Sequence, residues 1–250
     1  MGLLTFKGGI HPDDGKRFSK DQPIKALLPT GDLIYPLSQH IGAPANPVVA
    51  VGDHVLKGQM IAEAGGFVSA PIYASVSGTV KAIAPHLNPT GGRVNSIVIE
   101  NDGEYKEVEY PEVTPLEDMS KEDILNAIGT AGVVGMGGAG FPTCVKLKPA
   151  KPVDTILLNG CECEPLLTAD HRVLLEYADD IIFGLRAVLK TTGAQKGIIV
   201  IEDNKPDAIE LMQKKVADIE NMEVFVARTK YPQGAEKTLI KRVMGRKVPS

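Results

Sequence analysis

The pattern of hydrophobic and polar residues changes character between the two halves of the chain. Up to about residue 110, short apolar runs rich in β-branched residues are broken by Gly, Pro and Asn, as at 47–53 and 96–100. Such runs are typical of a small all-β unit. From residue 150 onward, strand-length apolar runs alternate with helical stripes. The pattern predicts an all-β domain over 1–110 and an α/β, Rossmann-like domain over 111–250.

The predicted α/β domain has three repeats of strand and helix. Strands are expected at 154–158, 197–201 and 223–226, and helices at 169–189, 206–219 and 236–244. The first helix places one apolar stripe inward, and the second helix places another. The two stripes are Leu174, Tyr177, Ile181, Leu185 and Val188, and then Ile209, Met212, Val216 and Ile219.

The segment between the two zones is an acidic, proline-punctuated linker at 110–118. Ser120 is followed three residues later by Asp123, the spacing of a capping box. We therefore expect a helix that opens there, runs to about Ala131 and stops at Gly132.

Composition excludes several classes of protein. The net charge is −4, and no Lys/Arg-rich run with interleaved aromatics suggests nucleic-acid binding. No stretch approaches the roughly 18 apolar residues of a membrane span, and the first ten residues do not resemble a secretory signal. We expect a cytosolic protein whose membrane contact runs through partners. The three cysteines, Cys144, Cys161 and Cys163, favour neither a disulfide framework nor a bound metal.

The loops after the three predicted strands are polar. They are 159–165, 202–204 and 230–236, and each carries at least one carboxylate. Ligands of open α/β sheets bind beyond the carboxyl ends of the strands. Converging carboxylates there are costly to desolvate without a ligand or a partner.

A glycine-rich loop at 135–143 follows the helix that is expected to open at Ser120, and Lys146 comes shortly after the loop. Its four glycines allow backbone N–H groups to approach a phosphate or a flat ring. A nucleotide cradle is one interpretation and a tight turn or flexible linker is the other. The spacing matches neither Gly-x-Gly-x-x-Gly after a strand nor a Walker loop.

The all-β zone resembles the barrel-sandwich hybrid of biotinyl and lipoyl carrier domains, over 51–62, 69–72 and 77–80. A carrier domain presents a lysine at a hairpin tip. The corresponding turn here is Ala64-Gly65-Gly66-Phe67, so a structural or docking role is expected instead.

Three ordered motifs, at 137–143, 159–165 and 231–237, resemble the C subunits of Rnf complexes. They are also similar to the NADH-binding flavoprotein of respiratory complex I. The resemblance implies FMN on the glycine loop with NADH stacked over it, hydride exchange between them, and electrons passed to iron–sulfur clusters. It implies a nucleotide site lined by Gly135, Gly137, Gly138, Ala139, Gly140, Phe141, Lys146, Asn159, Glu162, Glu164, Tyr231, Gly234 and Glu236, with Glu164 as the catalytic candidate.

In detail, the resemblance implies that Phe141 contacts the adenine side, Lys146 the phosphates and Asn159 the flavin. The carboxylates of Glu162, Glu164 and Glu236 would surround the nicotinamide and ribose, and Tyr231 would help to close the site. The partners implied are NADH and the other Rnf subunits, with the protein peripheral on the cytoplasmic side of the membrane.

The sequence departs from the family pattern in two ways. Met136 and Cys161 stand where complex I flavoproteins carry an Arg and an Asp, so contacts inferred for those positions do not transfer. Rnf C subunits also continue into a domain with two 4Fe–4S clusters, which are expected only beyond this chain. The alternatives are a degenerate scaffold similar to the A subunit of the sodium-pumping NADH:quinone oxidoreductase, or a carrier module.

Overall fold

The computed structural model describes residues 6–88, 91–136 and 140–248, which form two compact units. One unit is Leu27–Ala150, and the other combines Met1–Ala26 with Lys151–Ser250. The division differs from a boundary after residue 110, because backbone bonds tie the first segment to the carboxyl-terminal half. Leu166 donates to Asp14 at 2.6 Å, and Ile10 exchanges two bonds of 3.0 Å with Tyr231.

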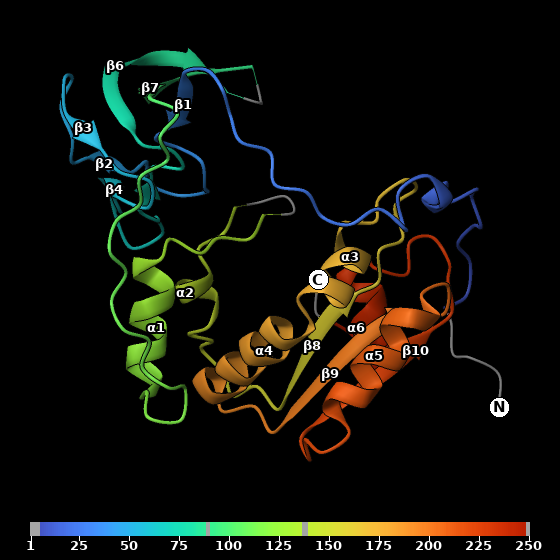
Figure 1. Ribbon diagram of the computed structural model, residues 1–250. Helices are drawn as coiled ribbons and strands as arrows, with labels where there is room; N and C mark the ends of the chain where they lie inside the picture. The colour runs from blue at the N-terminus through green and yellow to red at the C-terminus, as the bar shows by residue number, and fades with distance from the viewer. Residues whose placement is uncertain (1–5, 89–90, 137–139, 249–250) are drawn as a thin grey trace. The chain divides into compact units, whose positions relative to one another are not determined.

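The unit 27–150 contains two antiparallel sheets (Figure 1). The first has the order β1-β7-β6-β3, and its centre is a long hairpin of β6 and β7. The second has the order β2-β4-β5. The strands are β1 Leu33–Pro36, β2 Asn46–Pro47, β3 His54–Val55, β4 Met60–Glu63, β5 Ile72–Tyr73, β6 Gly78–Leu87 and β7 Arg93–Asn101. One core of buried side chains joins the sheets, among them Val55, Ile61, Ile72, Val80, Ile97 and Ile99.

Two helices follow the sheets in this unit. Helix α1 spans Lys121–Thr130 and is followed by the short α2, Thr143–Lys146. The capping box predicted for α1 is confirmed, since the Ser120 hydroxyl accepts from the Asp123 amide at 3.1 Å and the Asp123 carboxylate accepts from the Ser120 amide at 2.9 Å.

The other unit is built on a parallel sheet with the order β10-β9-β8. Its strands are β8 Thr155–Gly160, β9 Lys196–Glu202 and β10 Met222–Ala227. Its helices are α3 Ala169–Glu176, α4 Ala178–Thr192, α5 Pro206–Val216 and α6 Glu236–Met244, and a 3-10 turn, η1, spans Lys16–Phe18. The predicted α/β fold class is therefore confirmed.

Helices cover both faces of this sheet (Figure 1). Alternate residues of β9 point to opposite faces, as the pleat of a strand requires. Ile199 and Ile201 pack into the core formed with α3, α4 and α5, whereas Ile198 and Val200 pack with Leu239 of α6. With both faces filled, the polar residues collect at the carboxyl ends of the strands.

The single helix predicted over 169–189 is wrong, because the chain leaves helical geometry at Tyr177 (φ −126°, ψ 35°) and restarts as α4. Tyr177 is exposed, whereas Leu174 and Leu185 of the predicted stripe are buried and Ile181 packs against the same core. The other buried positions of α4 include Ala178, Ile182 and Leu189. Periodicity continued across the break therefore assigns Tyr177 to the core wrongly but places most of the stripe on the correct side.

Candidate functional site

The carboxyl edge of the parallel sheet is held together by Asn159, near the end of β8. Its side-chain amide donates to the Gly234 carbonyl at 2.8 Å, and its oxygen accepts from the Cys161 amide at 3.1 Å. The loops after β8 and β10 are thereby fixed to each other. Gly234 is required at this contact, because a Cβ there would lie 2.3 Å from the Cys161 carbonyl oxygen.

Glu162 is a buried carboxylate whose two oxygens are both engaged within the unit. One accepts from the Asp170 amide in the first turn of α3 at 2.8 Å, a favourable place for an anion. The other lies 3.5 Å from the Lys16 ammonium. Both side chains are less than one-tenth exposed, so the pair is shielded from solvent.

Lys16 was not anticipated from the sequence. It also donates to the carbonyls of Glu164 at 3.2 Å and Leu167 at 2.6 Å. One buried ammonium therefore positions the whole loop after β8. A lysine in a polar segment such as Asp-Asp-Gly-Lys ordinarily indicates an exposed side chain, and nothing local in the sequence places it 146 residues away against Glu162.

Glu164 and Tyr231 form the outer part of this edge. The Glu164 carboxylate is exposed and bonded to the Tyr231 hydroxyl, and this bond, with the carboxylate charge, raises the pKa of Tyr231. Tyr231 precedes a cis peptide bond to Pro232 and pairs through its backbone with Ile10. The structure thus brings together two residues that the family resemblance assigned to one site.

Glu236 completes the exposed edge as the first residue of α6. A carboxylate in the first turn of a helix is favoured by the helix dipole. With Glu164 in the loop after β8, it gives two exposed acidic side chains on the loops that follow β8 and β10.

Behind this edge lies a second, buried set of polar residues that the sequence did not single out as site residues. Glu202 at the end of β9 and Lys205 are at most 1% exposed, with 3.7 Å between carboxylate and ammonium. Burial raises the pKa of Glu202, and Lys205 opposes the shift. Both side-chain amide atoms of buried Gln233 lack a hydrogen-bond partner among the described residues. Unpaired buried polar atoms call for an explanation, such as ordered water.

A cavity of about 60 Å³ adjoins this buried set and is lined, among others, by Lys16, Glu162, Glu202, Asn204 and Tyr231. It is too small for a nucleotide, because ligand pockets usually measure about 300–1,000 Å³. Its polar lining and size suit one or two water molecules, each of which occupies about 30 Å³.

The glycine-rich loop belongs to the unit 27–150, as do Phe141 and Lys146. Backbone bonds from Gly135 to Phe141 and from Thr143 to Val133, both 2.9 Å, close a hairpin-like stem. Gly137, Gly138 and Ala139 lie outside the described residues. The predicted site residues are therefore divided between the two compact units.

The two ends of the described loop differ in their surroundings. A Cβ on Gly135 would meet nothing closer than 3.8 Å. Gly140 has φ +57°, and a Cβ there would lie 3.1 Å from backbone atoms of Gln39 and His40. Gly140 is thus needed for the turn itself. Lys146 at the end of α2 is exposed, so its ammonium is accessible to an anion.

These residues fit a flavin and a dinucleotide in chemical terms. The exposed carboxylates of Glu164 and Glu236 are acceptors suited to ribose or ribityl hydroxyls and to an amide N–H. They do not suit a phosphate, whose charge calls for backbone N–H groups and a cation of the kind the glycine loop and Lys146 supply. Each class of residue thus suits a different chemical group, and the two classes lie on different compact units.

Two kinds of feature are missing from the described residues. Within 6–88, 91–136 and 140–248, no group of His, Cys, Asp and Glu side chains could hold a metal ion. No helix in that same part of the chain has the length and apolar character needed to cross a bilayer.

Comparison with known proteins identifies the two domains. A family model for the RnfC barrel sandwich hybrid domain matches residues 4–104, and one for the Nuo51 FMN-binding domain matches residues 128–250. The chain thus combines a barrel sandwich hybrid with an FMN-binding type of α/β domain.

Curated relatives match nearly the whole chain. The chain is 47% identical to the C subunit of the Na⁺-translocating ferredoxin:NAD⁺ oxidoreductase complex of Acetobacterium woodii, over 98% of this chain and 56% of that protein. It is 48% identical to the proton-translocating counterpart of Clostridium ljungdahlii, over 99% and 55%. A C subunit of the ion-translocating oxidoreductase complex of Haemophilus influenzae is 39% identical, over 99% and 31%. The chain belongs to the RnfC family and spans about half the length, or less, of these relatives.

Proposed function

We propose that this chain supplies the NADH- and FMN-binding part of the C subunit in an ion-translocating ferredoxin:NAD oxidoreductase. The observation that carries the proposal is the pair of hydrogen bonds between the loops after β8 and β10. The Asn159 amide donates to the Gly234 carbonyl, and the Glu164 carboxylate is bonded to the Tyr231 hydroxyl. Two exposed carboxylates and a tyrosine stand on loops that internal bonds hold in place. Such preorganisation is what a hydride-transfer site requires of its protein.

The residues take separate roles in this proposal. Glu164 and Glu236 accept hydrogen bonds from the ribose and carboxamide of the dinucleotide, and Tyr231 closes the nicotinamide end. Asn159 and Lys16 hold the loops. The glycine loop and Lys146 bind phosphate. Bound FMN would supply the conversion between two-electron hydride transfer and single-electron transfer.

The rest of the longer relatives provides the continuation of the electron path in this proposal. Two 4Fe–4S clusters on that part of the protein would take electrons from the flavin, and the other Rnf subunits would hold it at the cytoplasmic face of the membrane. The described residues include only three cysteines, fewer than the four thiolates that one cluster usually takes from a chain.

The test is the visible spectrum of the full-length protein purified with FMN. We expect an oxidised flavin band that bleaches on addition of NADH, with slower bleaching in Glu164→Gln. A full-length protein that binds FMN but is not reduced by NADH would contradict the proposal.

One observation favours a second candidate, a scaffold protein without bound nucleotide. Asn159 and Glu162 already make hydrogen bonds inside the protein with their side chains. Failure of the full-length protein to bind either FMN or NADH would support this scaffold function.

A further inference from the structure

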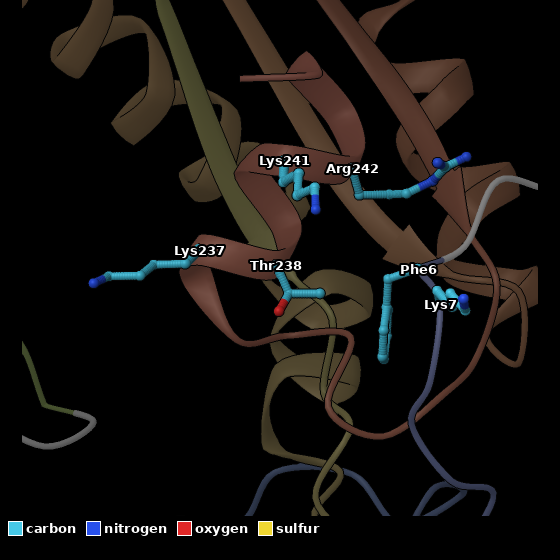
Figure 2. Close-up of a pocket in the computed structure, with 6 residues that line it drawn as sticks. All are labelled: Phe6, Lys7, Lys237, Thr238, Lys241 and Arg242. Carbon is cyan, nitrogen blue, oxygen red and sulfur yellow. The ribbon is translucent and has the colours of Figure 1, made fainter. Parts of the chain in front are cut away.

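We infer that a basic pocket between the amino-terminal segment and α6 binds a phosphoryl-bearing small anion, a phosphate or pyrophosphate ester. The pocket has a volume of about 480 Å³ and lies within one compact unit. Its lining consists of Phe6, Lys7, Lys237, Thr238, Lys241 and Arg242 (Figure 2). The set shares no residue with the proposed dinucleotide site, and the inference stands independently of that proposal.

The charge of the pocket is one-sided. Four of its six lining residues are cationic, and none is a carboxylate. Within the part of the chain that the structure describes, the side chains of Lys7, Lys237, Lys241 and Arg242 form no ion pair. Other basic residues of this unit behave differently, as Lys215 with Asp179 and Arg246 with Asp154 show. Cations gathered without counter-charges repel one another, and an anion would relieve that repulsion.

Arg242 provides the second observation. Its Nε atom is buried and has no hydrogen-bond partner among the described residues. A guanidinium donates through a planar fork that matches two oxygens of a phosphate or carboxylate. The protein therefore leaves this guanidinium short of partners, and the arginine that carries it lines the cationic pocket.

The wall of the pocket that faces α6 is the amino-terminal segment, and Lys230 holds this segment in place. The Lys230 ammonium lies 4.9 Å from the centre of the Phe6 ring and donates to the Phe6 carbonyl at 3.1 Å. These contacts hold the amino-terminal segment against the sheet. In Figure 2, Thr238 and Lys241 lie on the side of α6 that faces Phe6, while Lys237 extends to one side and the Arg242 side chain to the other.

A phosphoryl group suits this lining better than an acidic protein segment. Lys7, Thr238, Lys241 and Arg242 line one cavity of ligand size. Multiple charge-assisted hydrogen bonds to one compact anion are the usual mode of phosphate recognition.

The experiment is calorimetric titration of the 250-residue chain with inorganic pyrophosphate and with inorganic phosphate. We expect saturable binding that weakens as salt rises, pyrophosphate binding the tighter because it carries more charge. The double variant Lys241→Gln/Arg242→Gln should lose at least about tenfold in affinity, equal to about 1.4 kcal/mol. Arg242→Lys should lose less, because it keeps the charge but not the fork. Lys214→Gln, an exposed lysine on α5, is the matched control and should bind as the unmodified chain does.

Vesicle flotation separates the two sources of the phosphoryl group. Binding of free pyrophosphate without retention on phosphatidic acid vesicles assigns a soluble phosphate ester, and retention that depends on Lys241 and Arg242 assigns a lipid headgroup. Absence of saturable binding to any phosphoryl compound by the unmodified chain would overturn the inference. So would equal affinity in a folded double variant, or binding of an acidic peptide alone.

Discussion

The two layers of polar residues at the edge of the parallel sheet use the same residue types in opposite ways. In the inner layer, Lys16 and Glu162 are buried against each other. In the outer layer, Glu164 and Glu236 are exposed. A buried charge is costly unless it is paired, so the inner side chains bond to each other and to the loops and are not free to bind a ligand. Exposure leaves the outer carboxylates available to a ligand.

The comparison predicts that breaking the inner layer is the most damaging change. Lys16→Met leaves the Glu162 carboxylate buried without its cation, and losing one partner of a buried pair costs about 3–5 kcal/mol. The free energy of unfolding, measured by urea titration, should fall by that amount. Lys16→Met combined with Glu162→Met should recover part of the loss, because no buried charge is then unpaired although the bonds to the Glu164 and Leu167 carbonyls and to the Asp170 amide are still missing. A single variant as stable as the unmodified chain would show that the pair is not buried in solution.

The second-largest loss of stability is expected from disturbing the contact of Gly234 with the loop after β8. Gly234→Ala forces a methyl group against the Cys161 carbonyl, and overpacking of this kind costs about 1–3 kcal/mol. Gly184→Ala is the matched control. It lies within α4 with open space around it, so the same substitution should stabilise the chain by about 0.5–1 kcal/mol. Equal effects of the two substitutions in thermal unfolding would contradict the close contact at Gly234.

Changes to the outer layer should hardly alter stability. Glu164→Gln should change the free energy of unfolding by less than about 0.5 kcal/mol, as surface substitutions usually do. The substitution should instead change the titration of Tyr231, because the hydrogen bond and the charge of Glu164 raise the pKa of that tyrosine.

The sign of the pH effect follows from that shift. A raised pKa means that folding favours the neutral Tyr231 phenol, so this contribution is present below the tyrosine's unfolded pKa and is lost as pH rises through the folded value. In Glu164→Gln, the ultraviolet difference spectrum should show one tyrosine ionising at lower pH than before. An unchanged tyrosinate titration would mean that Glu164 and Tyr231 are not bonded.

The sequence predicted local features well where neighbours along the chain determine them. The capping box of α1 and the bounds of α6 are examples, since each depends on residues within one or two turns. The prediction of one helix over 169–189 failed because α3 and α4 are separated only by the non-helical backbone of Tyr177, which the hydrophobic pattern does not reveal. Lys16 and Gln233 could not be found, because their burial depends on segments far apart in sequence.

For the candidate site, the family motifs selected residues that the structure partly brings together. Glu164 meets Tyr231, and Asn159 meets Gly234. Sequence could not distinguish exposed Glu164 from buried Glu162, which stand two positions apart in one motif. Their ligand contacts stay predictions.

The most direct test of the account is flavin reduction by NADH and by NADPH in the full-length protein. The outer carboxylates should repel the 2′-phosphate of NADPH, and a tenfold preference for NADH needs only about 1.4 kcal/mol. We expect a preference of at least that size, larger at low salt and reduced in Glu164→Gln, because screening and charge removal both weaken the repulsion. Equal rates with the two dinucleotides in the unmodified protein would show that Glu164 and Glu236 do not face the nucleotide.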